Sequence, residues 1–292
     1  MYLINDKSEY NDKYRLGIKN ELSSRGILVN SVGVFDGFFS GMKVILFLAF
    51  KRQVYISSNM KSNLFCLFAF WSKGLIIVNG LGRYKYSSFF RISFSFLLFL
   101  NSSSKVIIFQ NYSDYRYFKR NVKARIFWVP GSGGISREIN IGDDVLIISR
   151  NDKISKVYDS VLKFFLFMNG ERKIVFVGCS PSEVKNKFNN DKIVGIGRVK
   201  QSDIFKQSNY FFQPRGYGEG VPHSLVDAIC SGMTIIITKK DFVSFGLYVL
   251  GFEFNPLNYE FGHLYFTDEV SSFVSQNEIS KLYVDIFIDN LV

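Results

Sequence analysis

Two carboxylates lie close together in one glycine-rich stretch of the chain. Glu219 lies in QPRGYGEG and Asp227 in the following PHSLVDAI, with seven residues between them. The second segment predicts a short helix, because Pro222 suits a first helical turn and apolar residues recur along one side. Amides at a helix start bind phosphates and carboxylates accept hydrogen bonds from hydroxyls, which indicates a ligand with both groups. The alternative is that Glu219 interacts favourably with the helix dipole and Asp227 is solvated.

Basic residues follow another apolar stretch. Arg150 comes directly after the predicted strand 145–149, and Lys153 and Lys156 follow within six residues of it. The carboxyl end of a parallel strand faces the ligand crevice of an α/β sheet, where arginine offers a fork of donors for phosphate and lysine a point charge. The alternative is a set of basic residues on a solvated loop.

The elements that must position these residues alternate along the whole chain, which predicts a parallel sheet covered by helices. A helix at 40–52 is expected to be mostly buried, and one helix is expected over 11–25. The expected strands are 1–5, 27–34, 53–57, 75–79, 105–109, 126–129, 145–149, 173–178, 192–196, 210–213 and 234–238. The other expected helices are 64–71, one ending at 120, one ending at 168, one over 202–207 and two after 268.

Glycine turns close two of these strands. Gly80 and Gly82 follow one strand, and the run VPGSGG at 129–134 follows another. Glycines at a strand end let the backbone approach a ligand closely or bend between domains. The segment 83–100 joins basic residues to a run rich in phenylalanine and leucine, which is typical either of a helix in a membrane interface or of a core helix with a basic end.

Composition limits the function further. The chain has 292 residues, a formal net charge of +11, three cysteines and two histidines. Two α/β domains fit this length, and the charge indicates an anionic partner such as a phosphate-bearing substrate or anionic lipid. Two histidines argue against a histidine-based triad or a histidine-rich metal site. The unpaired cysteines and the polar first ten residues predict a cytoplasmic protein without a signal peptide.

Several motifs, in order, resemble family 4 glycosyltransferases, which are GT-B enzymes that use nucleotide sugars. GEGVPHSLVDAICSGMTIII resembles the family signature, with Asp227 in place of its second glutamate and Thr234 in place of a proline. NGLGRYKYSSFF and IIFQNYSDYRYF resemble segments of bacterial surface-polysaccharide enzymes, VPGSGG resembles the family's hinge, and SRNDKISK resembles its donor-phosphate motif.

This resemblance implies an α/β architecture of two Rossmann-like domains facing a cleft, with the first domain shortened. Residues 1–138 would be the acceptor-side domain and residues 139–292 the nucleotide-sugar domain, with the last helix crossing back. The implied reaction moves a sugar from a nucleotide diphosphate to a growing lipid-linked or oligosaccharide acceptor of the O-antigen or capsule type, with retention and without a metal or cofactor.

The resemblance also implies roles for particular residues. Glu219, Arg150 and Lys156 would be catalytic, although Lys153 is an alternative to Lys156 at the donor phosphates. The implied donor-binding residues are Gly131, Ser132, Gly133, Lys153, Arg215, Gly220, Val221, Pro222 and Asp227. The implied acceptor-side residues are Gly80, Gly82 and Arg83.

The sequence leaves two functions open. The chain is either the enzyme, peripheral on an anionic cytoplasmic membrane face, or a non-catalytic nucleotide- or membrane-binding subunit of a glycan assembly complex. Specific nucleic-acid binding is disfavoured, because the basic residues are scattered and form no recognised module.

Overall fold

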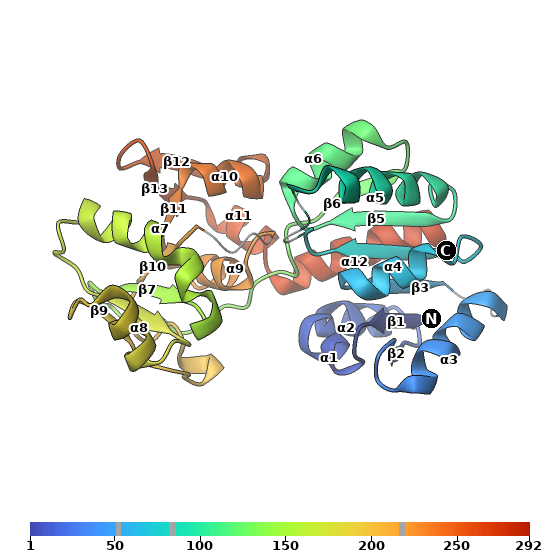
Figure 1. Cartoon of the computed structure of the whole chain (residues 1–292), viewed down its shortest axis with the longest axis horizontal. Coiled ribbons are helices and arrows are strands. Elements are labelled where there is room, and N and C mark those ends of the chain that lie inside the picture. Colours follow the sequence, from blue (N-terminus) through green and yellow to red (C-terminus); the bar gives the residue numbers. More distant parts are fainter. Residues whose placement is uncertain (51–53, 82–83, 85, 216–219) are drawn as a thin grey trace. The chain divides into compact units, whose positions relative to one another are not determined.

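The structure, a computed structural model, describes residues 1–50, 54–81, 84, 86–215 and 220–292. The chain forms two compact units, each built on its own sheet (Figure 1). The first unit contains the residues through Gly133, the pair Gly220 and Val221, and the residues from Gln276 onward. The second unit begins at Gly134. The sequence placed this division after residue 138.

The sheet of the first unit is parallel along its described strands, which lie in the order β2-β1-β3-β4-β5-β6. The carboxyl ends of these strands therefore meet at one edge. The strands are β1 (Tyr2–Asn5), β2 (Asn30–Gly33), β3 (Tyr55–Ser58), β4 (Gly74–Val78), β5 (Lys105–Phe109) and β6 (Arg125–Trp128).

Helices cover both faces of this sheet. One core joins the sheet to α3, α4, α5 and α6, and a second core on the other face joins it to α2 and α12. Figure 1 shows α12, in red, along the first-unit sheet although it comes last in the sequence. The helices are α1 (Glu9–Tyr14), α2 (Leu16–Ser24), α3 (Phe38–Phe50), α4 (Met60–Leu67), α5 (Ser88–Leu100), α6 (Tyr112–Asn121) and α12 (Gln276–Leu291).

Three helices of this unit test the predictions from the sequence. The helix expected over 11–25 is divided in two at Arg15. The helix expected to be mostly buried, α3, exposes Phe39 and Phe50 by 64% and 80%, so that prediction is wrong. Helix α5 buries Phe94 and Leu98 and exposes other aromatic and aliphatic residues along its length.

The sheet of the second unit has the order β12-β13-β11-β10-β7-β8-β9. Strands β12 and β13 form an antiparallel hairpin at one edge, which the sequence did not predict, and the other described strands are parallel. The strands are β7 (Val145–Ile148), β8 (Ile174–Val177), β9 (Ile193–Gly195), β10 (Tyr210–Gln213), β11 (Thr234–Thr238), β12 (Glu253–Pro256) and β13 (Phe261–Tyr265).

Helix α9 connects β10 to β11, and these strands pair in parallel with Tyr210 opposite Thr234. The βαβ unit predicted around Asp227 is therefore confirmed. On one face of the sheet, α7 and α8 pack on a core of aromatic and aliphatic residues. The helices of this unit are α7 (Ile154–Phe167), α8 (Pro181–Phe188), α9 (His223–Cys230), α10 (Lys239–Phe245) and α11 (Asp268–Phe273), and short 3₁₀ turns lie at Asn151–Lys153, Gln201–Asp203 and Leu247–Leu250.

No helix in the described part of the chain combines the length and the apolar character that crossing a membrane requires.

Candidate functional site

The basic residues of the second unit lie where β7 ends. Arg150 is extended, its side chain is 70% exposed, and its Nε lies 3.4 Å from Oδ1 of Asp152. The chain then makes a 3₁₀ turn through Lys153 and enters α7, whose first turn presents an exposed Lys156. All three cations thus lie within eight residues of the strand end, and both lysines stay candidates for a phosphate contact.

A second arginine comes from the neighbouring strand. Strand β10 pairs with β7 and ends in Gln213, so Arg215 leaves the sheet at the same edge as Arg150. The backbone N–H of Arg215 donates to Oγ of Ser160 on α7 over 3.0 Å, and its side chain is exposed. Two guanidiniums at adjacent strand ends give this edge the positive charge that a diphosphate requires.

Helix α9 begins one residue later than the sequence predicted. Pro222 is extended and caps the helix, which starts at His223. Leu225, Val226, Ala228 and Ile229 are buried, as expected for an apolar helix face, and Gly232 ends the helix with φ +74°. The amides of the first turn therefore follow Pro222 directly.

Asp227 holds another segment of the same unit. Its two carboxylate oxygens accept hydrogen bonds from the backbone N–H of Ile135, over 2.9 Å, and from the guanidinium of Arg137, over 3.2 Å. The backbone N–H of Arg137 also donates to Oγ of Ser231, over 3.0 Å. A carboxylate has further lone pairs, so the arrangement leaves room for a ligand hydroxyl, but anchoring of residues 135–137 is its role inside the chain.

Gly134 lies against the backbone of α9. A Cβ at this position would lie 2.4 Å from the carbonyl oxygen of Val226 and 2.9 Å from the nitrogen of Asp227. The N–H of Gly134 donates to the carbonyl of Val274 over 2.9 Å. Glycine is therefore required by close packing here, because any side chain would meet main-chain atoms.

In the first unit, the sequence analysis missed a buried cation. Arg15, at the break between α1 and α2, is 3% exposed and donates to Oγ of Ser132, to Oδ1 of Asn79 (2.7 Å) and to the carbonyl of Tyr14 (3.3 Å). None of these partners is an acid, and the Nε has no partner among the described residues. Burial lowers the pKa of Arg15, yet a guanidinium stays charged, so among the described residues no acid balances this positive charge at the sheet edge.

Asn79 and Ser132 belong to a polar network at the carboxyl edge of this sheet. Gln110 donates through Nε2 to the Gly131 carbonyl (2.9 Å) and to the hydroxyls of Ser132 (3.2 Å) and Tyr283 (2.8 Å). The Tyr283 hydroxyl in turn donates to the Gly131 carbonyl over 2.7 Å. The glycine run is thus held in place by buried side chains, with Gly131 at φ +73° and Gly133 at φ +81°.

Gly220 also lies at this edge. A Cβ on Gly220 would lie 2.9 Å from the carbonyl oxygen of Gln110 and 3.1 Å from that of Asn79. Val221 lies close by, since its carbonyl oxygen is 3.4 Å from a Cβ placed on Gly131. The structure therefore brings Gly131, Ser132, Gly220 and Val221 together within the first unit.

The remaining predicted site residues either lie apart from this group or lie outside the described part of the chain. Gly80 follows β4, and the next residue, Leu81, donates its N–H to Asp114 over 3.1 Å. Glu219, Gly82 and Arg83 lie outside the described residues. Their predicted roles therefore stay predictions.

The buried phenol of Tyr283 gives a pH-dependent prediction. Burial raises the pKa of Tyr283 to about 12, so the folded state favours the neutral phenol. The free energy of unfolding should thus be unaffected below the unfolded pKa of about 10 and fall as pH rises above it, by about 1 kcal/mol at about pH 11. In urea titrations, Tyr283→Phe should be less stable by about 1 kcal/mol at neutral pH and should lose less stability than the native chain above pH 10.

The exposed Tyr259 supplies the control, since Tyr259→Phe should keep the native pH profile. Equal alkaline losses in Tyr283→Phe and the native chain would contradict the prediction.

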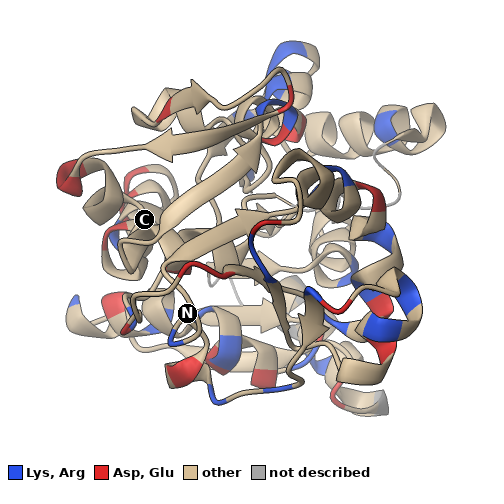
Figure 2. Cartoon of the chain, turned by 90° about the vertical axis from the view of Figure 1, so that its left-hand side faces the viewer, with Lys and Arg blue, Asp and Glu red and all other residues tan. Residues whose placement is uncertain are grey.

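Neither unit shows a metal centre in its described part: no three His, Cys, Asp or Glu side chains gather there in a way that could hold a metal ion. Figure 2 shows lysine and arginine interspersed with aspartate and glutamate over the helices and loops that face the viewer. In this view, the described lysine and arginine residues do not form a continuous basic stripe of the kind that follows a nucleic-acid backbone.

No protein-family model matches the sequence, and no curated protein is significantly similar to it. Solved structures do share its fold. The crystal structure of Anabaena Alr3699/HepE in complex with UDP and glucose is similar over 99% of this chain and 95% of the other, with a TM-score of 0.56 and 10% identity. The chain has a GT-B fold.

Two further structures support this GT-B assignment. The crystal structure of TarM is similar over 87% of this chain, with a TM-score of 0.51 and 10% identity. The crystal structure of the GtfA/B complex is similar over 86% of this chain, with a TM-score of 0.50 and 10% identity. This chain spans 55% of the TarM chain and 60% of the GtfA/B chain. The prediction of two Rossmann-like domains is confirmed.

Proposed function

We propose that the chain is a glycosyltransferase that moves a sugar from a nucleotide diphosphate to a growing glycan. One observation supports this most: a GT-B fold, similar over nearly the whole chain to a structure that holds UDP and glucose, places Arg150 and Arg215 at adjacent strand ends. In α/β sheets this edge is where phosphate-bearing ligands bind. The proposal places the donor in the second unit.

The chemistry follows from the leaving group. As the bond between the sugar and the diphosphate breaks, negative charge develops on the phosphate oxygens, and fixed cations stabilise it. Arg150 and Arg215 supply that charge together with Lys156 or Lys153, and the amides after Pro222 add to it. Glu219 contacts the donor sugar or diphosphate, and Asp227 offers its remaining lone pairs to the ribose hydroxyls. The acceptor hydroxyl transfers its proton to the departing phosphate, so the proposal requires no strong base and no metal ion.

The acceptor belongs to the first unit in this proposal. Its carboxyl edge carries the charge of Arg15 and the glycine turns at Gly80 and Gly131. A positive charge that no described acid pairs with suits an anionic acceptor, such as a glycan on a lipid phosphate. We extend the proposal to a retaining enzyme of the family 4 type that builds an O-antigen or capsule glycan, with peripheral contact at an anionic cytoplasmic membrane face.

The test is nucleotide binding by calorimetry with UDP, GDP, ADP and CMP. We expect the native chain to bind one diphosphate selectively and Arg150→Ala to weaken that binding at least tenfold, since charge-assisted hydrogen bonds contribute about 1.5–3 kcal/mol. The exposed Arg120 on α6 provides the matched control, because Arg120→Ala removes the same charge from the first unit. Equal affinities in all three proteins would contradict the donor site.

One observation supports a second candidate, a non-catalytic partner subunit of a glycan assembly complex. Both oxygens of Asp227, the residue predicted to contact the ribose, accept hydrogen bonds from the chain itself. Failure of the folded protein to bind any of the four nucleotides would favour this candidate. Turnover of a nucleotide sugar would exclude it.

A further inference from the structure

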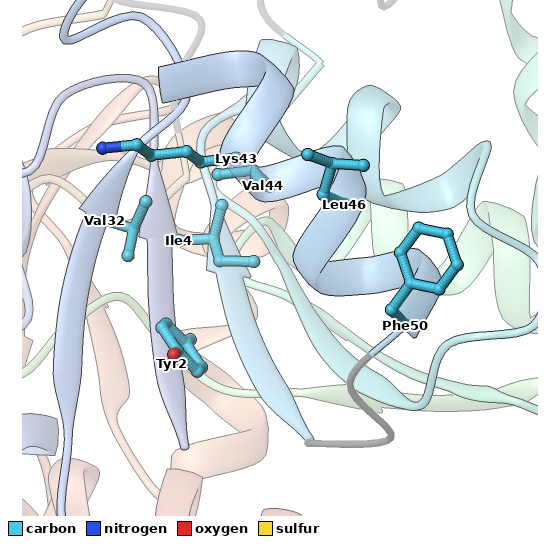
Figure 3. A pocket seen from close by; sticks show the side chains of 7 residues that line it. All are labelled: Tyr2, Ile4, Val32, Lys43, Val44, Leu46 and Phe50. Atoms are coloured by element: carbon cyan, nitrogen blue, oxygen red, sulfur yellow. The ribbon is translucent and has the colours of Figure 1, made fainter. Parts of the chain in front are cut away.

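A pocket of about 510 Å³ lies between helix α3 and strands β1 and β2 of the first unit. Figure 3 shows its lining side chains along the helix and across the two strands. The lining residues are Tyr2, Ile4, Val32, Lys43, Val44, Leu46 and Phe50. Its volume falls within the range of about 300–1,000 Å³ that is typical of ligand-binding pockets.

One of the described lining residues is charged. Lys43 supplies an ammonium, and the other lining side chains are aliphatic or aromatic. Among the described residues, Lys43 forms no ion pair, so its charge is available to a ligand. A long apolar pocket with a single cation suits an amphiphile that has a hydrocarbon chain and an anionic head.

The pocket opens onto an apolar surface rather than a polar one. Leu46 and Phe50 line it, and they are also exposed, by 49% and 80%. Phe39, Met42 and Ile45 continue the exposed apolar side of α3. Exposed apolar patches of this kind are typical of surfaces that contact a membrane or an apolar partner. We therefore expect a ligand that enters here to come from a hydrocarbon environment.

The pocket runs from the carboxyl half of the strands, at Ile4 and Val32, to their amino ends. Lys43 and Phe50 are seven residues apart, about 10 Å along a helix axis. Tyr2, another lining residue, starts β1 and so lies at the amino end of the strand. Arg15 and Asn79 lie at the opposite, carboxyl edge. The end of the pocket at Tyr2 and Phe50 therefore lies away from the edge that carries Arg15 and Asn79.

We propose that this pocket binds one hydrocarbon chain of an anionic membrane phospholipid, with the lipid phosphate at Lys43. The net charge of +11 favours an anionic surface over a zwitterionic one. The proposal rests on the membrane contact in the proposed function and gives it a binding site. It does not depend on sugar transfer, since lipid binding is measured without a nucleotide sugar.

The first experiment measures cosedimentation of the full chain with phosphatidylcholine vesicles, with and without phosphatidylglycerol. We expect binding only with phosphatidylglycerol, weakened roughly fivefold by Lys43→Gln, which removes one surface charge at the bilayer. Lys185→Gln, on the exposed side of α8, removes an equal charge from the second unit and should change binding less than about twofold. Equal losses of vesicle binding in the two variants would show that only the net charge matters, and they would overturn the assignment of Lys43.

The second experiment tests the pocket itself with lysophosphatidylglycerol, a single-chain probe, titrated below its micellar concentration. The native chain should bind one molecule, and Val32→Phe, which fills the pocket from β2, should weaken binding at least tenfold. Leu46→Glu, at a half-exposed position, should weaken it similarly without changing the core. Unfolding curves show whether each variant is folded. Unsaturable binding, or native affinity in either folded variant, overturns the proposal, whereas the nucleotide titrations judge the transfer reaction separately.

Discussion

Asp227→Ala is expected to destabilise the second unit by about 2–3 kcal/mol. The substitution leaves the guanidinium of Arg137, which is 10% exposed, without its acid partner, and it leaves the N–H of Ile135 without an acceptor. Removing one member of a buried ion pair costs about 3–5 kcal/mol, and the partial exposure of this pair reduces that figure. The free energy of unfolding, from urea titration of the native chain and the variant, measures the effect.

Asp227→Asn serves as the matched variant because it keeps one oxygen for Ile135 and loses only the charge. It should lie between the native chain and Asp227→Ala in stability. Nucleotide affinity separates the structural role of Asp227 from its proposed contact with the ribose. Unchanged affinity in a folded Asp227→Asn protein would show that Asp227 only anchors residues 135–137. A loss below about 0.5 kcal/mol in Asp227→Ala would show that the ion pair does not hold residues 135–137.

Gly134→Val is expected to cost about 3 kcal/mol and to displace the segment that follows it. The new Cβ would lie 2.4 Å from the Val226 carbonyl oxygen, and main-chain atoms of a packed helix cannot move aside as a flexible side chain can. Overpacking of this kind costs about 1–3 kcal/mol, and the branched side chain places the effect at the upper end.

Gly142→Ala provides the comparison for Gly134→Val. Its Cβ would meet the Gln207 carbonyl at an ordinary 3.7 Å, so its unfolding free energy should stay within about 0.5 kcal/mol of the native value. Thermal unfolding of the two variants beside the native chain measures the difference. Equal midpoints for all three would mean that the contact of Gly134 with α9 does not exist in solution.

The order of elements could be predicted because buried parallel strands have a simple sequence pattern. Strands β4 and β5 consist mainly of aliphatic residues, are fully buried and lie between helices, so alternation along the chain was enough to place them. The antiparallel hairpin of β12 and β13 was missed because β12 is largely exposed and has no apolar run. The sequence did contain one indication of the turn, which is Asn258. In the structure its side chain accepts hydrogen bonds from the N–H groups of residues 260 and 261.

Helix α3 shows where composition misleads. Its sequence is apolar on all sides, and such a pattern predicts burial all round. The structure buries Val44 and Leu48 against the sheet and leaves Phe39 and Phe50 outside. A pattern without a polar face cannot say which apolar side meets the core, because that depends on the strands beneath the helix.

The same difference between local patterns and long-range contacts applies to individual residues of the candidate sites. The position of Arg150 at the end of β7 could be predicted because only Ser149 separates it from the strand, and the same local reasoning found the start of α9 to within one residue. Arg15 could not, because its partners Asn79 and Ser132 lie 64 and 117 residues away and no local pattern links them. The pairing of Asp227 with Arg137 was missed for the same reason, since 90 residues separate the two.

The place of α12 has a consequence for the order in which the chain acquires its structure. Ile279, Tyr283 and Phe287 complete the core over one face of the first-unit sheet. A ribosome makes these residues only after the whole second unit, so residues 1–133 leave the exit tunnel with only α2 available to cover that face. Until α12 is made, the nascent first half exposes Leu75 and Ile77 to chaperones and to other chains. Folding of the first unit therefore becomes complete only after α12 has been made, although its sheet is encoded first.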